Sequence, residues 1–186
     1  MSEYPLIKYG SPTLAGIKVG NLMGVVCRDW AECREFLHTM NRKLNKKGIF
    51  LICLKFCDHR AWLYLFRPLA LKKLLWNSRV MNLLKEKGYS TGNLGELLQS
   101  LKERLQAYCL KENFPHEIGF FLGYPIPDVL SFCENQGRNC LYCGTWKVYH
   151  DVEGARACFQ RYKACTDNFC SRYARGMSLE SLAVKL

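Results

Sequence analysis

The sequence lacks any hydrophobic run long enough to cross a membrane. Its longest apolar stretches, Ile49–Leu54 and Ala61–Phe66, are far shorter than the roughly 20 residues that span a bilayer. The first residues, Met1–Lys8, also lack the basic segment and following apolar segment of a secretory signal. From these absences we expect no membrane segment and a cytoplasmic location.

Blocks of like charge are absent as well, although the chain is strongly basic. Lys and Arg number 27 against 16 Asp and Glu, and this formal net charge of +11 includes no block of five or more like charges. The excess of cations lies almost entirely in residues 1–113. This basic surface can attract nucleic acid, anionic lipid or another acidic partner, or it can simply be a solvated lysine-rich surface.

The composition indicates one folded domain. The chain has 186 residues, of which 49% are hydrophobic and 13% aromatic, so disorder of the whole chain is excluded and a core can form without staples. We interpret residues 1–170 as a single α+β domain with a small, partly antiparallel sheet packed with amphipathic helices. Residues 171–186 are expected to be a loosely attached C-terminal tail, with one turn of helix from Ser178.

Hydrophobic periodicity and capping residues predict the individual elements. Residues 1–27 read as irregular because glycines and a proline recur in them. The helices are predicted at 30–45, 68–87, 93–108, 127–136 and from 152, and the strands at 49–55, 61–67, 118–123 and 146–149.

The chain carries eleven cysteines, an odd number. Without a secretory signal we expect most of them to be reduced, in keeping with a reducing or anaerobic cell. Each is then a small core residue, a metal ligand or a reactive thiol. We expect packing roles for Cys33, Cys53 and Cys109, which fall in predicted stripes or strands. Cys158, Cys165 and Cys170 can form a second ligand set, but we favour packing for them. We also favour packing over a metal group formed by Cys53, Cys57 and His59, because residues four apart on a strand lie about 13 Å apart.

The densest cysteine group is Cys133, Cys140 and Cys143, followed by His150. Two thiolates separated by two residues can point at one metal, and Cys133, His150 or His116 can complete a tetrahedral set. A soft transition metal, zinc or iron, is the cofactor that suits these ligands. The same spacing also suits a dithiol redox pair or two packed cysteines at a turn.

A second candidate is the pair His116 and Glu117, which follows Pro115 and is expected in a loop that enters a strand. Histidine titrates near neutral pH, so the pair can act as acid and base or as ligands. Neighbours on a strand point to opposite faces, so a structural or capping role is the alternative.

A third candidate is the loop Ser11–Lys18, whose backbone N–H groups and Lys18 ammonium can meet an anion. It does not have the Gly-x4-Gly-Lys-Ser/Thr pattern of a phosphate-binding loop, so an ordered N-terminal loop is the alternative. His116, Glu117 and Lys18 are the candidate catalytic residues. Aromatic residues also lie beside cations at 146–149 and 161–163, as in nucleic-acid surfaces, but no binding motif accompanies them.

Three blocks together resemble an uncharacterised bacterial family. They are the segment SPTLAGIK at residues 11–18, FPHEIGFFLGYP at 114–125 and GTWKVY at 144–149. The family is a domain of unknown function found mainly in anaerobic Firmicutes. In it a cysteine commonly precedes the first block, whereas Gly10 stands there in this chain. The resemblance implies one domain in an anaerobic cytosol and transfers no catalytic residue.

We therefore expect a cytosolic protein that binds a metal or a small ligand through Cys140, Cys143 and the His116–Glu117 loop, with catalysis as one use of such a site. The alternative is a non-enzymatic module that binds nucleic acid or an acidic partner through the basic surface of residues 1–113. A third hypothesis is an interaction protein whose cysteines only pack.

Overall fold

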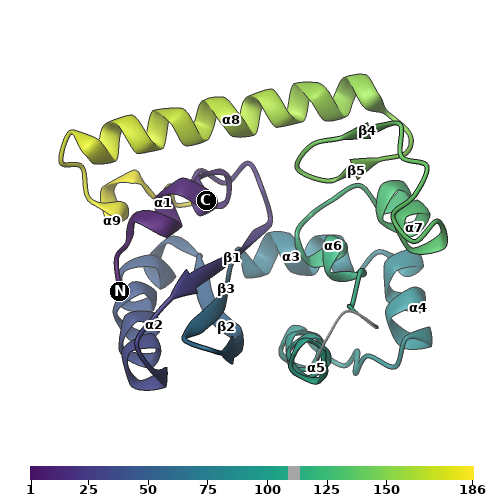
Figure 1. The fold of residues 1–186 in the computed structure, drawn as a ribbon, viewed down its shortest axis with the longest axis horizontal. Helices are drawn as coiled ribbons and strands as arrows, with labels where there is room; N and C mark the ends of the chain where they lie inside the picture. Colours follow the sequence, from purple (N-terminus) through teal and green to yellow (C-terminus); the bar gives the residue numbers. More distant parts are fainter. Residues whose placement is uncertain (109–113) are drawn as a thin grey trace. The chain divides into compact units, whose positions relative to one another are not determined.

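The computed structural model describes residues 1–108 and 114–186, and it confirms the α+β class (Figure 1). The chain divides into two compact units. Unit 1 comprises Met1–Leu71 and Cys165–Leu186, and unit 2 comprises Lys72–Ala164. The packing role expected for Cys109 lies outside the described residues.

Unit 1 is built on a three-stranded antiparallel sheet in the order β1-β3-β2. Its strands are β1 (Gly20–Val26), β2 (Phe50–Cys57) and β3 (Arg60–Phe66). The predicted hairpin between β2 and β3 is confirmed. Its turn residues, Asp58 and His59, have φ angles of 48° and 58°, the positive values that a two-residue hairpin turn requires.

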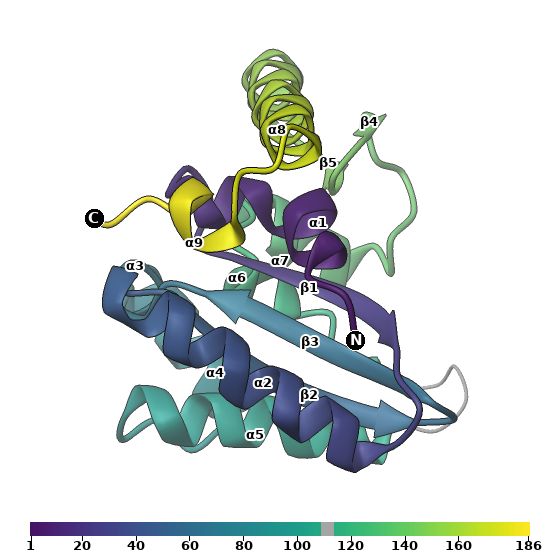
Figure 2. The ribbon, with the colours of Figure 1, turned by 90° about the vertical axis from the view of Figure 1, so that its left-hand side faces the viewer.

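The helices of unit 1 cover one face of this sheet. Alternate residues of β3, namely Ala61, Leu63 and Leu65, share a core cluster with Leu6 of one helix and Phe36 of another. Figure 2 shows these two helices alongside the strands. The helical elements of the unit are α1 (Tyr4–Leu14), α2 (Trp30–Leu44), the short 3-10 helix η1 (Asn45–Lys47), the start of α3 (Pro68–Leu75), the last part of α8 (Val152–Ala174) and α9 (Leu179–Leu182).

Helix α2 forms as its sequence predicts. The Asp29 side chain caps it by accepting a hydrogen bond of 2.8 Å from the backbone N–H of Glu32. Arg42 and Lys43 occupy its last turn, where cations interact favourably with the negative end of the helix dipole. Gly48 follows in the left-handed conformation, with a φ of 71°, and ends η1.

The expectation that residues 1–27 are irregular is wrong, because they form α1 and β1. Helix α1 contains Pro12 and Gly10, two residues that normally disfavour a helix interior. Gly10 allows a close approach to the sheet, since a Cβ added there would lie 2.7 Å from a methyl group of Leu65. Burial of Leu6, Ile7 and Leu14 therefore outweighs the local preference.

Unit 2 is mainly helical, with a two-stranded ribbon. The predicted elements near 93–108, 127–136 and 146–149 are confirmed as α5, α7 and β5. Its elements are the end of α3 (Pro68–Leu75), α4 (Ser78–Glu86), α5 (Leu94–Ala107), α6 (Ile118–Phe121), α7 (Ile126–Glu134), β4 (Tyr142–Cys143), β5 (Lys147–Val148) and the first part of α8.

Two predictions for the middle of the chain are wrong. The single helix expected at 68–87 is two helices, because the Asn77 side chain accepts hydrogen bonds from the N–H groups of Arg79 and Val80 and starts α4. The strand expected at 118–123 is the short helix α6. An apolar run without alternation does not distinguish a buried strand from a buried helix.

The expectation of a loose tail is also wrong for the residues that form α9. The turn of helix predicted from Ser178 is present, capped by a hydrogen bond of 3.1 Å from the N–H of Ser181 to the Ser178 hydroxyl. Leu179, Leu182 and Ala183 are buried in the core of unit 1. This end of the chain is thus part of the packed structure.

Candidate functional site

The Glu117 carboxylate lies at the centre of a buried polar cluster in unit 2. Tyr89 donates its hydroxyl to Glu117 Oε1 at 2.9 Å, and both residues are buried. Lys87 Nζ lies 3.7 Å from Glu117 Oε2, and Arg104 Nη1 lies 3.8 Å from Oε1. The guanidinium of Arg104 also stacks over the Tyr89 ring, 4.8 Å from its centroid.

This cluster links three helices through one side chain. Lys87 follows α4, Arg104 belongs to α5 and Glu117 precedes α6. Burial, followed by the charge of Glu117, raises the pKa of Tyr89 far above its ordinary value, so its hydroxyl remains a donor. With both carboxylate oxygens engaged, the geometry favours the structural reading of Glu117 over that of a free base.

His116 is exposed, and its ring lies beside two aromatic rings. Its ring centroid lies 5.3 Å from that of Phe114 and 4.9 Å from that of Phe132. Partial burial is the main cause that lowers its pKa, and Lys87 adds to this effect while Glu117 opposes it. His116 and Glu117 directly precede α6. The loop that was predicted to lead into a strand thus leads into a helix.

A pocket of about 350 Å³ opens elsewhere in unit 2, between the start of α7, β5 and the start of α8. We call it the Trp146 pocket. Its volume falls in the range of roughly 300–1,000 Å³ found for small-molecule sites. It joins two of the sequence blocks, since Gly123 and Pro125 come from the second block and Trp146 from the third.

Asp128 organises the wall of the Trp146 pocket. This buried side chain accepts a hydrogen bond of 2.8 Å from the Trp146 indole and one of 2.9 Å from the Tyr149 N–H. The indole is thereby fixed in the pocket wall. Trp146 also contacts Tyr124 and Phe159, with ring centroids 5.2 and 4.5 Å away.

The opposite wall comes from α8. Cys158 and Tyr162 lie four residues apart and form a side-chain hydrogen bond, and both line the pocket. Burial and then the Cys158 thiol raise the pKa of Tyr162. His150 and Asp151 add further polar groups, with His150 Nε2 3.1 Å from the Ser131 hydroxyl.

The cysteines of the predicted metal site are spread over several elements. Cys133 is half-buried in α7, Cys140 precedes β4, and Cys143 is exposed in β4. Over residues 1–108 and 114–186, no group of three or more His, Cys, Asp or Glu is placed to hold a metal ion. Cys133, Cys140, Cys143 and His150 are therefore not gathered into the predicted ligand set.

Tyr149 lies close to two of these thiols. Its hydroxyl is buried and has no hydrogen-bond partner in the described part of the chain. Burial raises its pKa, and the neighbouring Cys140, Asp128 and Cys133 add to the increase.

The segment predicted as the loop Ser11–Lys18 begins inside α1, which ends at Leu14. The Ser11 hydroxyl donates to the carbonyl of Ile7, and the Thr13 hydroxyl donates to Asn21 Oδ1 at 2.7 Å. Lys18 is buried. Lys18 belongs to unit 1, whereas His116 and Glu117 belong to unit 2.

Three other cysteines of unit 1 form a buried group. Cys33 belongs to the same core cluster as Cys27 and Cys53, and all three are buried. Burial raises the pKa of the Cys33 thiol to about 12. The packing roles predicted for Cys33 and Cys53 are confirmed by their burial.

The pocket residues were only partly visible in the sequence. In the sequence, Asp128 looks like an ordinary acid in the first turn of one helix. Cys158 and Tyr162 look like members of the apolar stripe of another helix, the one that starts at 152. The available signals were Trp146 in the third block, Gly123 and Pro125 in the second block, and His150, which was predicted as a metal ligand. Tyr89, Lys87 and Arg104 carry no motif and were missed.

Comparisons with known proteins place the chain in a family. No helix in the described residues is both long and apolar enough to cross a membrane. No curated protein and no solved structure matches the chain. The family described as "Protein of unknown function (DUF3793)" matches residues 6–183, nearly the whole sequence. The chain therefore belongs to this family, as the three blocks predicted.

Proposed function

We propose that the protein binds a small organic molecule in the Trp146 pocket. The observation that carries the proposal is a pocket of about 350 Å³ whose wall includes an indole fixed by a buried carboxylate. Sites for small ligands combine apolar and aromatic walls with a few positioned polar groups. The apolar and aromatic wall comes from Pro125, Trp146 and Tyr162. The polar groups are those of Asp128 and His150.

The lining also indicates the chemistry of the ligand. Asp128 and Asp151 are carboxylates, and the described residues that line the pocket include no Lys or Arg, although the chain as a whole is basic. An aromatic or apolar body can stack on Trp146, and an ammonium or other donor group suits the carboxylates. We therefore assign a ligand with a ring and a hydrogen-bond-donating group.

This proposal keeps part of the predicted Cys/His site. His150 lines the pocket together with Cys158, a cysteine that the sequence assigned to packing. A zinc or iron site at Cys140 and Cys143 is not part of the proposal, because the described side chains gather no third ligand. The cytoplasmic location remains a prediction.

The proposal is tested by NMR titration with benzylamine and benzoate, which share a ring and differ in charge. We expect benzylamine to shift the Trp146 indole N–H resonance saturably, with a Kd of about 1 mM, as is usual for fragments. The Trp146→Ala variant should lose the binding. The Trp76→Phe variant, which changes an indole of unit 2 outside this pocket, should retain it.

Two outcomes would contradict the proposal. The first is that neither ring compound perturbs a residue of the pocket. The second is that benzylamine binds the Trp146→Ala variant as well as the unchanged protein, because the ring would then bind elsewhere.

A further inference from the structure

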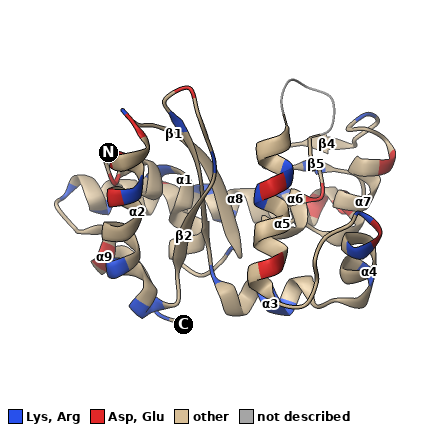
Figure 3. Cartoon of the chain, turned by 90° about the horizontal axis from the view of Figure 1, so that it is seen from below, with Lys and Arg blue, Asp and Glu red and all other residues tan. Residues whose placement is uncertain are grey.

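Unit 1 carries a second pocket, of about 730 Å³, along the C-terminal half of α2. We call it the α2 pocket. Its charged lining comprises Arg42, Lys43, Lys46 and a single acid, Glu180, with His38 at one end. Figure 3 shows Lys and Arg on many elements, so positive charge alone does not define a site. What distinguishes the α2 pocket is that cations line a concave surface.

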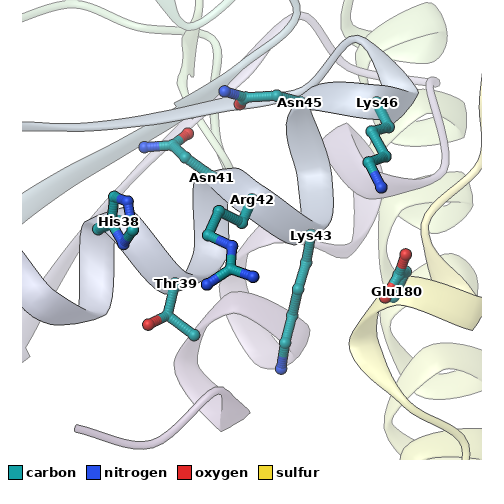
Figure 4. A pocket seen from close by; sticks show the side chains of 8 residues that line it. All are labelled: His38, Thr39, Asn41, Arg42, Lys43, Asn45, Lys46 and Glu180. Atoms are coloured by element: carbon teal, nitrogen blue, oxygen red, sulfur yellow. The ribbon is translucent and has the colours of Figure 1, made fainter.

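The walls of the α2 pocket are held by hydrogen bonds. Asn41 fixes α2 to β2, since its side chain accepts from the N–H of Leu51 at 2.9 Å and donates to the carbonyl of Leu51 at 2.8 Å. Lys47 Nζ donates to the carbonyls of Glu180 and Ala183, each at 2.6 Å, and so ties α9 to the end of η1. Figure 4 shows Glu180 across the pocket from Lys43 and Lys46.

The cations of the pocket differ in their partners. Lys43 forms an ion pair with Glu3. Arg42, Lys46 and His38 make no ion pair or hydrogen bond with any residue that the structure describes. In Figure 4 the Arg42 and Lys46 side chains project to the side of α2 where the pocket lies.

Arg42 lies in the last turn of α2, and Lys46 lies in η1, four residues further along the chain. Like charges at this spacing repel each other and destabilise a helix. The carbonyl end of α2 attracts cations and explains why some gather there. The carbonyl end of the helix does not remove the repulsion between Arg42 and Lys46. An anion bound between these two side chains would remove it.

We infer that the α2 pocket binds a small molecule that carries a chain of phosphate groups. Guanidinium and ammonium groups are the usual partners of phosphate, Arg42 through a two-pronged contact and Lys46 as a point charge. The volume of about 730 Å³ leaves room for more than one phosphate group. Glu180 closes the far side and selects against a ligand whose charge extends there. This inference does not depend on the ligand of the Trp146 pocket.

The test is isothermal titration calorimetry at low ionic strength with tripolyphosphate as the probe, beside a thymidine decanucleotide. We expect tripolyphosphate to bind, and the Arg42→Gln, Lys46→Gln double variant to lose about tenfold or more in affinity. The Arg34→Gln, Lys185→Gln double variant removes two exposed cations of unit 1 outside the pocket. It should change the affinity for tripolyphosphate less than about threefold. Glu180→Gln should tighten binding.

Each other result overturns the inference. Equal weakening in the two double variants would mean attraction to the net charge of the surface. Binding of the decanucleotide without binding of tripolyphosphate would make α2 a nucleic-acid surface. Weaker binding in Glu180→Gln would contradict the assigned geometry, and absence of tripolyphosphate binding would remove the site. The five substituted residues are all exposed, so the variants should fold, which thermal unfolding checks.

Discussion

At the scale of single residues, the cysteines of this chain differ sharply in their chemistry. Cys33 is fully buried and its pKa is raised to about 12, whereas Cys143 is exposed in β4. Alkylation needs the thiolate. A rise from the ordinary 9.0 to about 12 lowers the thiolate fraction about a thousandfold below pH 9.

We therefore predict that iodoacetamide modifies Cys143 first in the native protein and Cys33 only after unfolding. Peptide mass spectrometry at pH 7 and pH 9 measures the order. Cys33 should remain unmodified at both pH values, because burial limits both its access and its ionisation. Native labelling of Cys33 at the rate of Cys143 would show that the buried group of unit 1 opens readily.

The Glu117 cluster gives a prediction about stability. Glu117→Gln keeps the shape of the side chain but removes the charge that faces Lys87 and Arg104. We expect it to lower the free energy of unfolding by about 2–3 kcal/mol, and Tyr89→Phe to lower it by about 1.5–3 kcal/mol. The first figure lies below that of a fully buried pair because Lys87 and Arg104 remain 38% and 39% exposed.

Urea unfolding measures both variants of this cluster. Glu103→Gln is the matched control, since it makes the same change on the exposed face of α5 and should cost less than about 0.5 kcal/mol. If Glu117→Gln costs no more than the control, the carboxylate is not a structural anchor. Its role as a base would then regain support.

At the scale of elements, the sequence predicted what local chemistry decides. Helices α2 and α5 carry both a capping side chain, Asp29 or Asn93, and a clear apolar stripe, and both were predicted. The β2–β3 hairpin likewise has two apolar runs around a short polar turn. Where capping, periodicity and turn residues agree, the fold could be predicted.

The missed elements are those in which tertiary contacts override local preference. Helix α1 contains Gly10 and Pro12, and the burial of its apolar residues, together with the close approach of Gly10 to Leu65, explains why a helix forms there. Helix α6 is buried on all sides, so its apolar run has no period. The break at Asn77 was visible as a capping residue, but the leucine stripe on either side of it obscured the signal.

The candidate site shows the same division. His116 and Glu117 were singled out for their chemistry, but their environment, with Tyr89, Lys87 and Arg104, depends on contacts between three helices. The Trp146 pocket arises from separate segments of the chain, and the hydrogen bond that joins two of them links Asp128 to Trp146, 18 residues further on. Cysteine spacing predicted a metal set, and spacing alone does not determine where Cys133 lies relative to Cys140.

At the scale of the whole molecule, unit 1 is closed by the end of the chain. Arg67 is buried and donates to the carbonyls of Thr13 and Leu14, each at 2.8 Å, and to that of Val184 at 2.7 Å. The N–H of Val184 in turn donates to the carbonyl of Leu14 at 3.0 Å. Residues that are far apart in the sequence thus share one buried hydrogen-bonding centre.

We predict from this closure that deletion of residues 178–186 destabilises unit 1 severely. The deletion exposes the surface that Leu179 and Leu182 cover, at about 1.5–3 kcal/mol for each leucine, and removes an acceptor of the buried Arg67. The total free energy of unfolding of a domain is only about 5–15 kcal/mol. Hydrogen exchange at the amides of α1 should therefore accelerate strongly, whereas deletion of Leu186 alone, which is 76% exposed, should leave it nearly unchanged. Equal protection of α1 in the two truncated proteins would mean that the end of the chain is a dispensable tail after all.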